Sequence, residues 1–224
     1  MDCCQCQGIE RLFGHEVAAK ELRHYRKHGA IKTTRVLIDA LKAEGVAGMT
    51  LLDIGGGIGT VQYEVLGAGA SGATMVEGSS AYLAAAREEA ERQGYSGSVR
   101  YYHGNFVNLA SDVYPADIVT LDRVICCYHD MQKLVALSSE KAKRLYGVVY
   151  PMDTRWVTFR VFMENLYWRL RGNPYRAFVH STADVDAVVR GNGLQLQFYR
   201  RVRNWQVVVY GRVERVMNIH SRVD

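Results

Sequence analysis

Long apolar runs, a signal-like start and an even set of cysteines are all lacking from this sequence. No uninterrupted apolar run approaches the roughly 20 residues that a membrane-spanning helix requires. The first residues, Met-Asp-Cys-Cys-Gln-Cys-Gln, lack the basic and apolar regions of a secretory signal peptide. The five cysteines are odd in number and form two clusters, which argues against an extracellular disulfide framework. We therefore predict a cytoplasmic protein without a membrane span.

Proline is also scarce, with three residues in a chain of 224, and no Pro-rich linker, internal repeat or low-complexity segment is present. A chain of this length can bury the core of one α/β domain. No dense Lys/Arg tract interleaved with aromatic residues stands out, and no nucleic-acid-binding motif is recognised, so we expect no nucleic-acid partner. The sequence leaves open whether the protein is a monomer or a homodimer.

Lysine is lacking from the last third of the chain. Residues 151–224 hold twelve arginines, no lysine and six acids, a balance of +6 that leaves residues 1–150 near −1. One interpretation is a solvated arginine-rich face. The other is that some of these arginines bind a carboxylate or phosphate of a substrate, since the guanidinium group suits both.

The most informative stretch that is present is Leu-Leu-Asp-Ile-Gly-Gly-Gly-Ile-Gly-Thr at residues 51–60. An apolar run ends in glycines, and a helical pattern begins at about Thr60. Glycine lets a ligand approach the backbone, and a helix N-terminus offers unpaired N–H groups. The pattern therefore predicts a strand, a turn and a helix that together hold a phosphate or a nucleoside.

The glycine spacing differs from the dinucleotide fingerprint G-x-G-x-x-G. Counted from Gly55, that fingerprint would require glycine at Thr60; counted from Gly56, it would require glycine at Ile58. Asp53 followed by G-x-G-x-G instead resembles motif I of the class I S-adenosylmethionine (SAM)-dependent methyltransferases. In that family the loop wraps the methionine end of SAM.

Strand and helix patterns alternate through the middle of the chain, which predicts a mainly parallel sheet covered on both faces. Helices are expected first at 9–28 and 32–44, the second capped by Thr33 or Thr34. The expected strands are 49–54, 72–77, 98–103, 117–122 and 145–150, and the helices between them are 60–68, 80–93 and 130–144. A helix at 182–190 and two alternating runs, 194–200 and 205–213, follow and predict a closing antiparallel hairpin. This ending resembles the seven-stranded class I methyltransferase fold, whose sheet has one antiparallel strand.

Ligands of open α/β sheets bind beyond the carboxyl ends of the strands. The second strand ends in Glu77-Gly78-Ser79, where an acid can accept hydrogen bonds from both hydroxyls of a ribose. The third is followed by Gly104-Asn105-Phe106, which resembles the Gly-Asp-Phe that holds adenine in many methyltransferases. Asn105 replaces the aspartate, so a carbonyl oxygen remains as acceptor while its charge is lost.

The resemblance implies that SAM is the cofactor, with S-adenosylhomocysteine as product. It implies these cofactor-binding residues: Asp53, Gly55, Gly56, Gly57, Gly59, Glu77, Gly78, Ser79, Gly104, Asn105, Phe106, Asp122 and Arg123. The Asn-Pro-Pro-Tyr motif of methyltransferases acting on DNA bases is absent, which argues against that class. The layout as a whole is similar to the magnesium-protoporphyrin O-methyltransferase-like branch, which has an N-terminal helical cap and a long insertion after the fifth strand.

We expect a single domain with five segments. They are a helical cap at 1–45, a SAM-binding core at 46–151, a lid-like insertion at 152–180, a helix and hairpin at 181–213, and a tail at 214–224. The insertion reads as a helix with apolar groups nearly all round, which favours burial on most sides. One interpretation is that the insertion packs on the sheet or on a second copy of the chain. The other is that it covers a pocket for a large acceptor. The substrate-binding candidates there are Trp156, Arg160 and Arg176.

The sequence predicts an enzyme that moves a methyl group from SAM to a small aromatic or acidic molecule, with O-methylation favoured. A carboxylate acceptor needs no base, whereas a phenol, amine or thiol benefits from one. The candidates for that base are His129, Tyr25, His28 and Tyr128. A module that binds SAM without turnover is an alternative.

A second alternative arises from the cysteines. Cys3, Cys4 and Cys6 lie in one segment, and Cys126 and Cys127 follow the fourth strand. If the N-terminal segment folds over the pocket, these thiols would bind zinc or present a thiol or a metalloid such as arsenite for methylation. The C-C-x-C spacing is not a standard zinc pair and has no second C-x-x-C partner, so we predict no metal.

Overall fold

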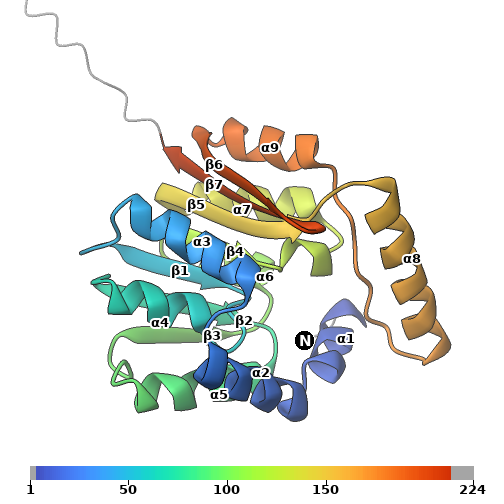
Figure 1. The fold of residues 1–224 in the computed structure, drawn as a ribbon, viewed down its shortest axis with the longest axis horizontal. Coiled ribbons are helices and arrows are strands. Elements are labelled where there is room, and N and C mark those ends of the chain that lie inside the picture. The colour runs from blue at the N-terminus through green and yellow to red at the C-terminus, as the bar shows by residue number, and fades with distance from the viewer. Residues whose placement is uncertain (1–3, 213–224) are drawn as a thin grey trace, which may run out of the picture.

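The fold is built on one seven-stranded sheet with the order β3-β2-β1-β4-β5-β7-β6. The structure is a computed structural model and describes residues 4–212 (Figure 1). All neighbouring strands are parallel except β7, which runs antiparallel to both β5 and β6. The strands are β1 (Thr50–Ile54), β2 (Gly72–Glu77), β3 (Val99–His103), β4 (Ala116–Asp122), β5 (Ala142–Pro151), β6 (Leu194–Val202) and β7 (Trp205–Arg212). The predicted parallel sheet with a closing hairpin is confirmed.

Helices cover both faces of the sheet (Figure 1). The helices are α1 (Cys4–Leu12), α2 (His15–His28), α3 (Lys32–Ala43), α4 (Thr60–Gly67), α5 (Ser80–Arg92), α6 (Phe106–Leu109), the 3₁₀ turn η1 (Ile125–Cys127), α7 (Met131–Glu140), α8 (Arg155–Leu170) and α9 (Thr182–Gly191). One buried cluster joins α3 and α4 to the sheet, and another joins α6, α7 and α9 to its opposite face. The helix α2 lies over α5 through Leu22 and Tyr82.

Local signals in the sequence explain where several helices begin. The hydroxyl of Ser79 accepts a hydrogen bond from the backbone of Tyr82 and caps α5. Asp130 and Thr154 cap α7 and α8 in the same way. Such caps satisfy backbone donors that a helix start leaves free. The three capped helices therefore begin directly after loops at the carboxyl ends of the parallel strands.

Three expectations about helices are wrong. The helix expected at 9–28 is two helices, because the chain turns at Phe13 and Gly14 between α1 and α2. The helix expected at 130–144 ends at Glu140, since the chain enters β5 at Ala142. The residue before α3 is Ile31 rather than Thr33 or Thr34, and the Thr34 hydroxyl instead donates to Asp122.

The insertion after β5 also differs from expectation. Of the side chains on α8, only that of Val157 is fully buried. The helix stands apart from the two layers that cover the sheet, and the extended segment 171–181 leads back from it to α9 (Figure 1). No helix within residues 4–212 has both the length and the apolar character to cross a membrane. Residues 1–3 and 213–224, including Cys3 and the predicted tail, lie outside the described residues, and so do the side chains of residues 4–7, including Cys4 and Cys6.

Candidate functional site

The loop between β1 and α4 folds tightly around the carboxylate of Asp53. Gly55, Gly57 and Gly59 have φ values of 64°, 58° and 85°, a region that side chains other than glycine rarely adopt. A Cβ atom on Gly56 would lie 2.6 Å from Oδ2 of Asp53. The glycines therefore let the backbone pass over this carboxylate and turn into α4.

Glu77 connects this loop to the end of β2. Its Oε2 atom accepts a hydrogen bond of 2.9 Å from the backbone N–H of Gly57, and its Oε1 atom accepts one of 2.8 Å from Ser79. The side chain is buried, and burial raises the pKa of its carboxyl, while the backbone donors at Ser79, Gly57 and Gly78 oppose the rise. The carboxyl group of Glu77 thus fixes the two loops that follow the carboxyl ends of β1 and β2.

Two further carboxyl groups lie at neighbouring strand ends, and each has one oxygen that accepts no hydrogen bond from the described residues. Oδ1 of Asp53 accepts a hydrogen bond of 2.7 Å from Thr120, while Oδ2 has no partner. Burial raises the pKa of Asp53 to about 7, and the charges of Asp122 and Glu77 add to the rise.

Asp122 differs in that its side chain is 10% exposed and has a cation beside it. Oδ2 accepts a hydrogen bond from the hydroxyl of Thr34, while Oδ1 accepts none from the described residues and lies 3.7 Å from Nε of Arg123. Burial raises the pKa of Asp122, and Arg123 and Thr34 oppose the rise. Unpaired oxygens of buried carboxylates are costly unless a ligand donor or a cation meets them.

Two cavities meet at this group of carboxylates. The first has a volume of about 380 Å³ and the second about 410 Å³. Five residues line both: Glu21, Gly55, Gly57, Asp122 and Arg123. The backbone of Arg123 has φ of 61°, so the chain turns sharply where β4 ends. The cavities thus share a wall made by the glycine loop and the end of β4.

The first cavity extends past the end of β3. Gly104, Asn105 and Phe106 line it. Oδ1 of Asn105 accepts a hydrogen bond of 3.0 Å from Val107 and caps α6, while its Nδ2 donates to the hydroxyl of Tyr128 at 3.2 Å. Both ends of the amide are therefore engaged, and the carbonyl oxygen keeps one further lone pair for a ligand.

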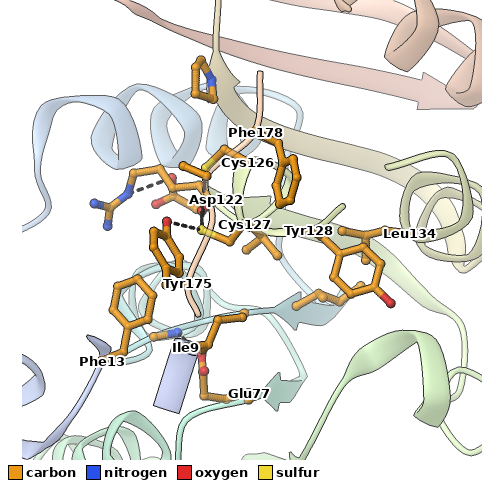
Figure 2. Close-up of a pocket in the computed structure, with 18 of the residues that line it drawn as sticks. Ile9, Phe13, Glu77, Asp122, Cys126, Cys127, Tyr128, Leu134, Tyr175 and Phe178 are labelled. Atoms are coloured by element: carbon orange, nitrogen blue, oxygen red, sulfur yellow. Dashed lines mark hydrogen bonds and ion pairs between the residues drawn. The ribbon is translucent and has the colours of Figure 1, made fainter. Parts of the chain in front are cut away.

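Thiols and aromatic rings form another wall of the first cavity. Figure 2 shows the hydroxyl of Tyr175 directed at Cys127, 3.3 Å from its sulfur, with Phe178 on the other side. The two sulfurs of Cys126 and Cys127 are 3.9 Å apart. Hydrogen bonds from Cys126 and Tyr175 lower the pKa of the Cys127 thiol, whereas the neighbouring Cys127 and burial raise that of Cys126.

The cap formed by α1 and α2 closes over the first cavity. The backbone oxygen of Phe13 accepts a hydrogen bond of 2.7 Å from Ser79, and the Phe13 ring meets that of Tyr175 edge-on at 6.1 Å. Gly8 packs against the backbone of segment 171–181, because a Cβ there would lie 2.4 Å from the nitrogen of Tyr175. Ile9 and Phe13 both line the cavity (Figure 2).

The residues predicted from the sequence fall into two groups. Those that line one or both cavities are Asp53, Gly55, Gly56, Gly57, Glu77, Gly78, Gly104, Asn105, Phe106, Asp122, Arg123, Tyr128, Tyr25 and Arg160. Those that line neither cavity are Gly59, Ser79, His28, His129, Trp156 and Arg176. His28 and His129 are exposed, and the Trp156 side chain is 63% exposed.

Sequence reasoning missed several residues of the first cavity. Phe13, Tyr82 and Tyr175 line it from three elements far apart in the chain. Each reads as an ordinary core aromatic in its local sequence, so no local signal could have identified it. Besides the predicted Arg160, helix α8 contributes Val157, Val161 and Glu164, which the predicted lid had indicated in outline only.

No protein-family model matches this sequence, and no curated protein matches it. Solved structures do match its fold. Magnesium protoporphyrin IX methyltransferase (ChlM) from Synechocystis PCC 6803, with bound SAH, superimposes with a TM-score of 0.71. That match has 16% sequence identity and covers 92% of this chain and 98% of the other. The fold is that of a class I methyltransferase.

Two further structures support the same class I methyltransferase fold. An O-methyltransferase family protein from Burkholderia thailandensis has a TM-score of 0.69 at 18% identity, covering 91% of this chain and 62% of that one. A putative sarcosine dimethylglycine methyltransferase from Galdieria sulphuraria has a TM-score of 0.63 at 12% identity, covering 80% and 85%. In a class I methyltransferase fold, the carboxylates, glycine loop and cavities described above lie at the carboxyl edge of the parallel strands, where such sheets bind ligands.

Proposed function

We propose that this protein is a SAM-dependent methyltransferase that methylates a small molecule, with S-adenosylhomocysteine as the second product. The observation that carries the proposal is the group of carboxyl side chains at the glycine loop, Asp53, Glu77 and Asp122. SAM carries a sulfonium and an ammonium group against one carboxylate, so its net charge is positive. The pyrophosphate of a nicotinamide dinucleotide would instead meet these acids with charge of the same sign.

Each part of SAM finds a matching group in the two cavities. In this proposal the carboxylate of Glu77 accepts hydrogen bonds from the ribose hydroxyls, and the carbonyl of Asn105 accepts one from the adenine amino group, beside Phe106; all three residues line the first cavity. The oxygens of Asp53 and Asp122 that accept no hydrogen bond from the described residues suit the ammonium end. When bound, SAM supplies both the methyl group and its leaving group, so the protein's task is to align acceptor and sulfonium and to exclude water.

The outer part of the first cavity fits an apolar or aromatic acceptor that carries an acidic group. Tyr175, Phe178 and Val161 supply apolar surface, and Arg160 supplies a cation. Among the described residues that line this cavity there is no histidine. A carboxylate acceptor needs no base, which favours O-methylation. The similarity in fold to a methyltransferase of magnesium protoporphyrin IX is consistent with such an acceptor.

Titration calorimetry with SAM, S-adenosylhomocysteine and NADH tests the choice of cofactor. We expect binding of SAM and S-adenosylhomocysteine and none of NADH; binding of NADH alone would overturn the proposal. Incubation with methyl-labelled SAM and a panel of aromatic carboxylic acids, porphyrins and phenols then tests turnover. SAM binding without transfer to any acceptor would favour the non-catalytic module.

Methylation of a thiol or a metalloid is a second candidate, favoured by Cys126 and Cys127 in the wall of the first cavity. Among the side chains that the structure describes, from Gly8 to Arg212, no group of three or more His, Cys, Asp or Glu is placed to hold a metal ion. The side chains of Cys3, Cys4 and Cys6 lie outside that range. Adding arsenite or small thiols to the same assay distinguishes this candidate, because transfer to them and not to carboxylic acids would support it.

A further inference from the structure

Helix α8 has two apolar faces, and only one of them has a partner in the fold. On the inner face, Asn165 exchanges two hydrogen bonds of 2.8 Å with the backbone of Ala177. The ring of Trp168 meets that of Tyr175 at 6.4 Å, and Val157 is buried. These contacts fix the orientation of the helix, so its opposite face is held outward.

The outer face carries most of the large apolar side chains that are exposed in the described residues. They are between 39% and 80% exposed: Trp156, Phe159, Phe162, Met163, Leu166, Tyr167 and Leu170. At about 100° per residue they fall within one arc of about 140°. In Figure 1, no other helix or strand of the described residues lies on the side of α8 that faces away from the sheet.

Arginines lie beside both borders of this arc. Arg169 lies just outside one border, with Arg155 just inside it, and Arg160 and Arg171 lie outside the other border. Glu164 is the one acid in this stretch, and it lies on the inner side, where it lines the first cavity. Among residues 4–212, no ion pair joins any of these four arginines to an acid. The outer face thus combines apolar surface with uncompensated positive charge.

We propose that the outer face of α8 docks on the surface of an anionic lipid bilayer. A helix that lies in a membrane interface buries tryptophan, phenylalanine and leucine at the boundary of the acyl chains, while arginines on its flanks meet the lipid phosphates. Each basic residue near an anionic surface adds about 1 kcal/mol to binding, or about fivefold in affinity. Arg155, Arg169 and Arg171, which do not line the first cavity, supply the basic contribution, and the aromatic arc supplies the apolar one.

A second copy of the chain suits this face less well than lipid does. A two-fold contact between identical surfaces would pair the outer face of α8 with itself. In an antiparallel arrangement of the two helices, Arg155 of one copy would approach Arg169 of the other. The like charges would oppose the contact, whereas the phosphates of a bilayer complement them.

Docking would also place the first cavity beside the lipid. The inner face of α8 lines that cavity with Val157, Arg160 and Val161, one helix diameter from the docked surface. An apolar acceptor dissolved in the bilayer would then reach the cavity without crossing bulk water. This consequence rests on the proposed function, whereas the docking itself does not.

Co-sedimentation of the full chain with lipid vesicles tests the proposal. We expect binding to vesicles of phosphatidylcholine mixed with phosphatidylglycerol, at least tenfold weaker binding to phosphatidylcholine alone, and loss of binding as salt is raised. The variant with Arg155→Gln and Arg169→Gln should bind about 25-fold more weakly to the anionic vesicles. Arg200→Gln, on the exposed strand β6, is the matched control and should bind as wild type.

The apolar contribution is tested with Phe159→Ser and Phe162→Ser combined, which should abolish sedimentation with the vesicles. Tyr114→Ser is its control, because Tyr114 is 77% exposed but lies far from α8 in the chain. Equal binding to neutral and anionic vesicles would overturn the proposal. An unchanged affinity of either α8 variant for the anionic vesicles would also overturn it. So would a wild-type protein that does not bind vesicles and is a dimer in light scattering, if the Phe159/Phe162 variant is a monomer. Calorimetry with SAM on the same variants separates failure of docking from failure of the proposed cofactor.

Discussion

The carboxylate of Glu77 accepts a hydrogen bond of 2.9 Å from the backbone N–H of Gly57. This contact joins the end of β2 to the loop that follows β1, across 20 residues of sequence. The second oxygen of Glu77 holds the N–H of Ser79 at the start of α5. The side chain proposed to bind the ribose therefore also fixes the shape of the loop proposed to bind the rest of SAM.

Replacement of Glu77 by alanine should weaken both binding and folding. The Glu77→Ala variant loses the ribose contacts and leaves the buried N–H groups of Gly57 and Ser79 without their acceptor. We expect SAM affinity to fall by about 1–3 kcal/mol and the free energy of unfolding to fall by a similar amount. Calorimetry and thermal unfolding measure the two effects. Glu91→Ala, on the exposed side of α5, is the control and should change neither; unchanged affinity in Glu77→Ala would show that Glu77 is not a cofactor ligand.

Binding of SAM should depend on pH through Asp53. Burial raises the pKa of this carboxyl to about 7 in the folded protein, above its ordinary value of 3.8. A cationic ligand binds the ionised form, so binding is linked to loss of one proton below pH 7. We expect SAM affinity to rise up to about tenfold per pH unit as pH increases toward 7, and to level off above it. Calorimetry at pH 6, 7 and 8 measures this, and a flat profile would contradict it.

The raised pKa of Asp53 also predicts that the free energy of unfolding falls as pH increases, whereas SAM affinity rises. Below pH 3.8, the pKa of Asp53 in the unfolded chain, its carboxyl does not lower the free energy of unfolding. Above that pH the carboxyl lowers it increasingly, until the pH passes the folded-state pKa of about 7. Asp53→Asn removes this cost, so at pH 8 the variant should be more stable than wild type by up to about 4 kcal/mol. It should also bind SAM more weakly and without the pH dependence. Urea unfolding at pH 4 and pH 8 provides the comparison, and equal stability at pH 8 would refute the argument.

The sequence predicted the central part of this arrangement because local pattern determines it. The glycine loop after β1 and the acid at the end of β2 follow directly from the strand and turn signals around Asp53 and Glu77. The closing hairpin was also readable, since apolar and polar residues alternate over 194–198 and a run of valines and a tyrosine follows at 207–210. The glycine loop and the hairpin are formed by residues that are close in sequence. The loop and Glu77 come together because the fold class places β1 and β2 side by side.

Contacts between distant segments could not be predicted in the same way. Thr34 looked like a helix cap, yet its hydroxyl donates to Asp122, 88 residues away. The apolar groups around α8 indicated a buried helix, but sequence alone does not show which face the fold will cover. The packing of Gly8 on the backbone of Tyr175 leaves no trace in the local sequence of either residue.

Asn105 offers a test of the adenine end of the cavity. In Asn105→Asp, the remaining oxygen still caps α6 through Val107, and the hydroxyl of Tyr128 can reverse to donate. A charged acceptor makes a stronger hydrogen bond to the adenine amino group, so we expect SAM affinity to rise about fivefold. Asn105→Ala should instead lose the cap and reduce stability by about 0.5–2 kcal/mol. Calorimetry measures the affinity of Asn105→Asp for SAM and for adenosine. If the affinity rises for neither ligand, the adenine does not bind at Asn105.

A single methyl group on α1 should disturb the cap that closes the first cavity. A Cβ on Gly8 would lie 2.4 Å from the nitrogen and 2.7 Å from the Cα of Tyr175, and backbone atoms on both sides leave little room to adjust. Alanine otherwise favours a helix over glycine, so without this contact Gly8→Ala would stabilise α1. We expect the clash to prevail, costing about 1–3 kcal/mol and moving α1 away from Tyr175.

The displaced cap should release the cofactor faster, because Phe13 would no longer lie against Tyr175 at the cavity. Stopped-flow fluorescence should show faster dissociation of SAM from Gly8→Ala, by about tenfold for each 1.4 kcal/mol of lost binding energy. Gly14→Ala is the matched control: its Cβ would meet nothing within 4 Å, and its φ of −78° suits alanine. If both variants dissociate at the wild-type rate, the cap does not retain the cofactor. If both accelerate it equally, the effect does not arise from the contact between Gly8 and Tyr175.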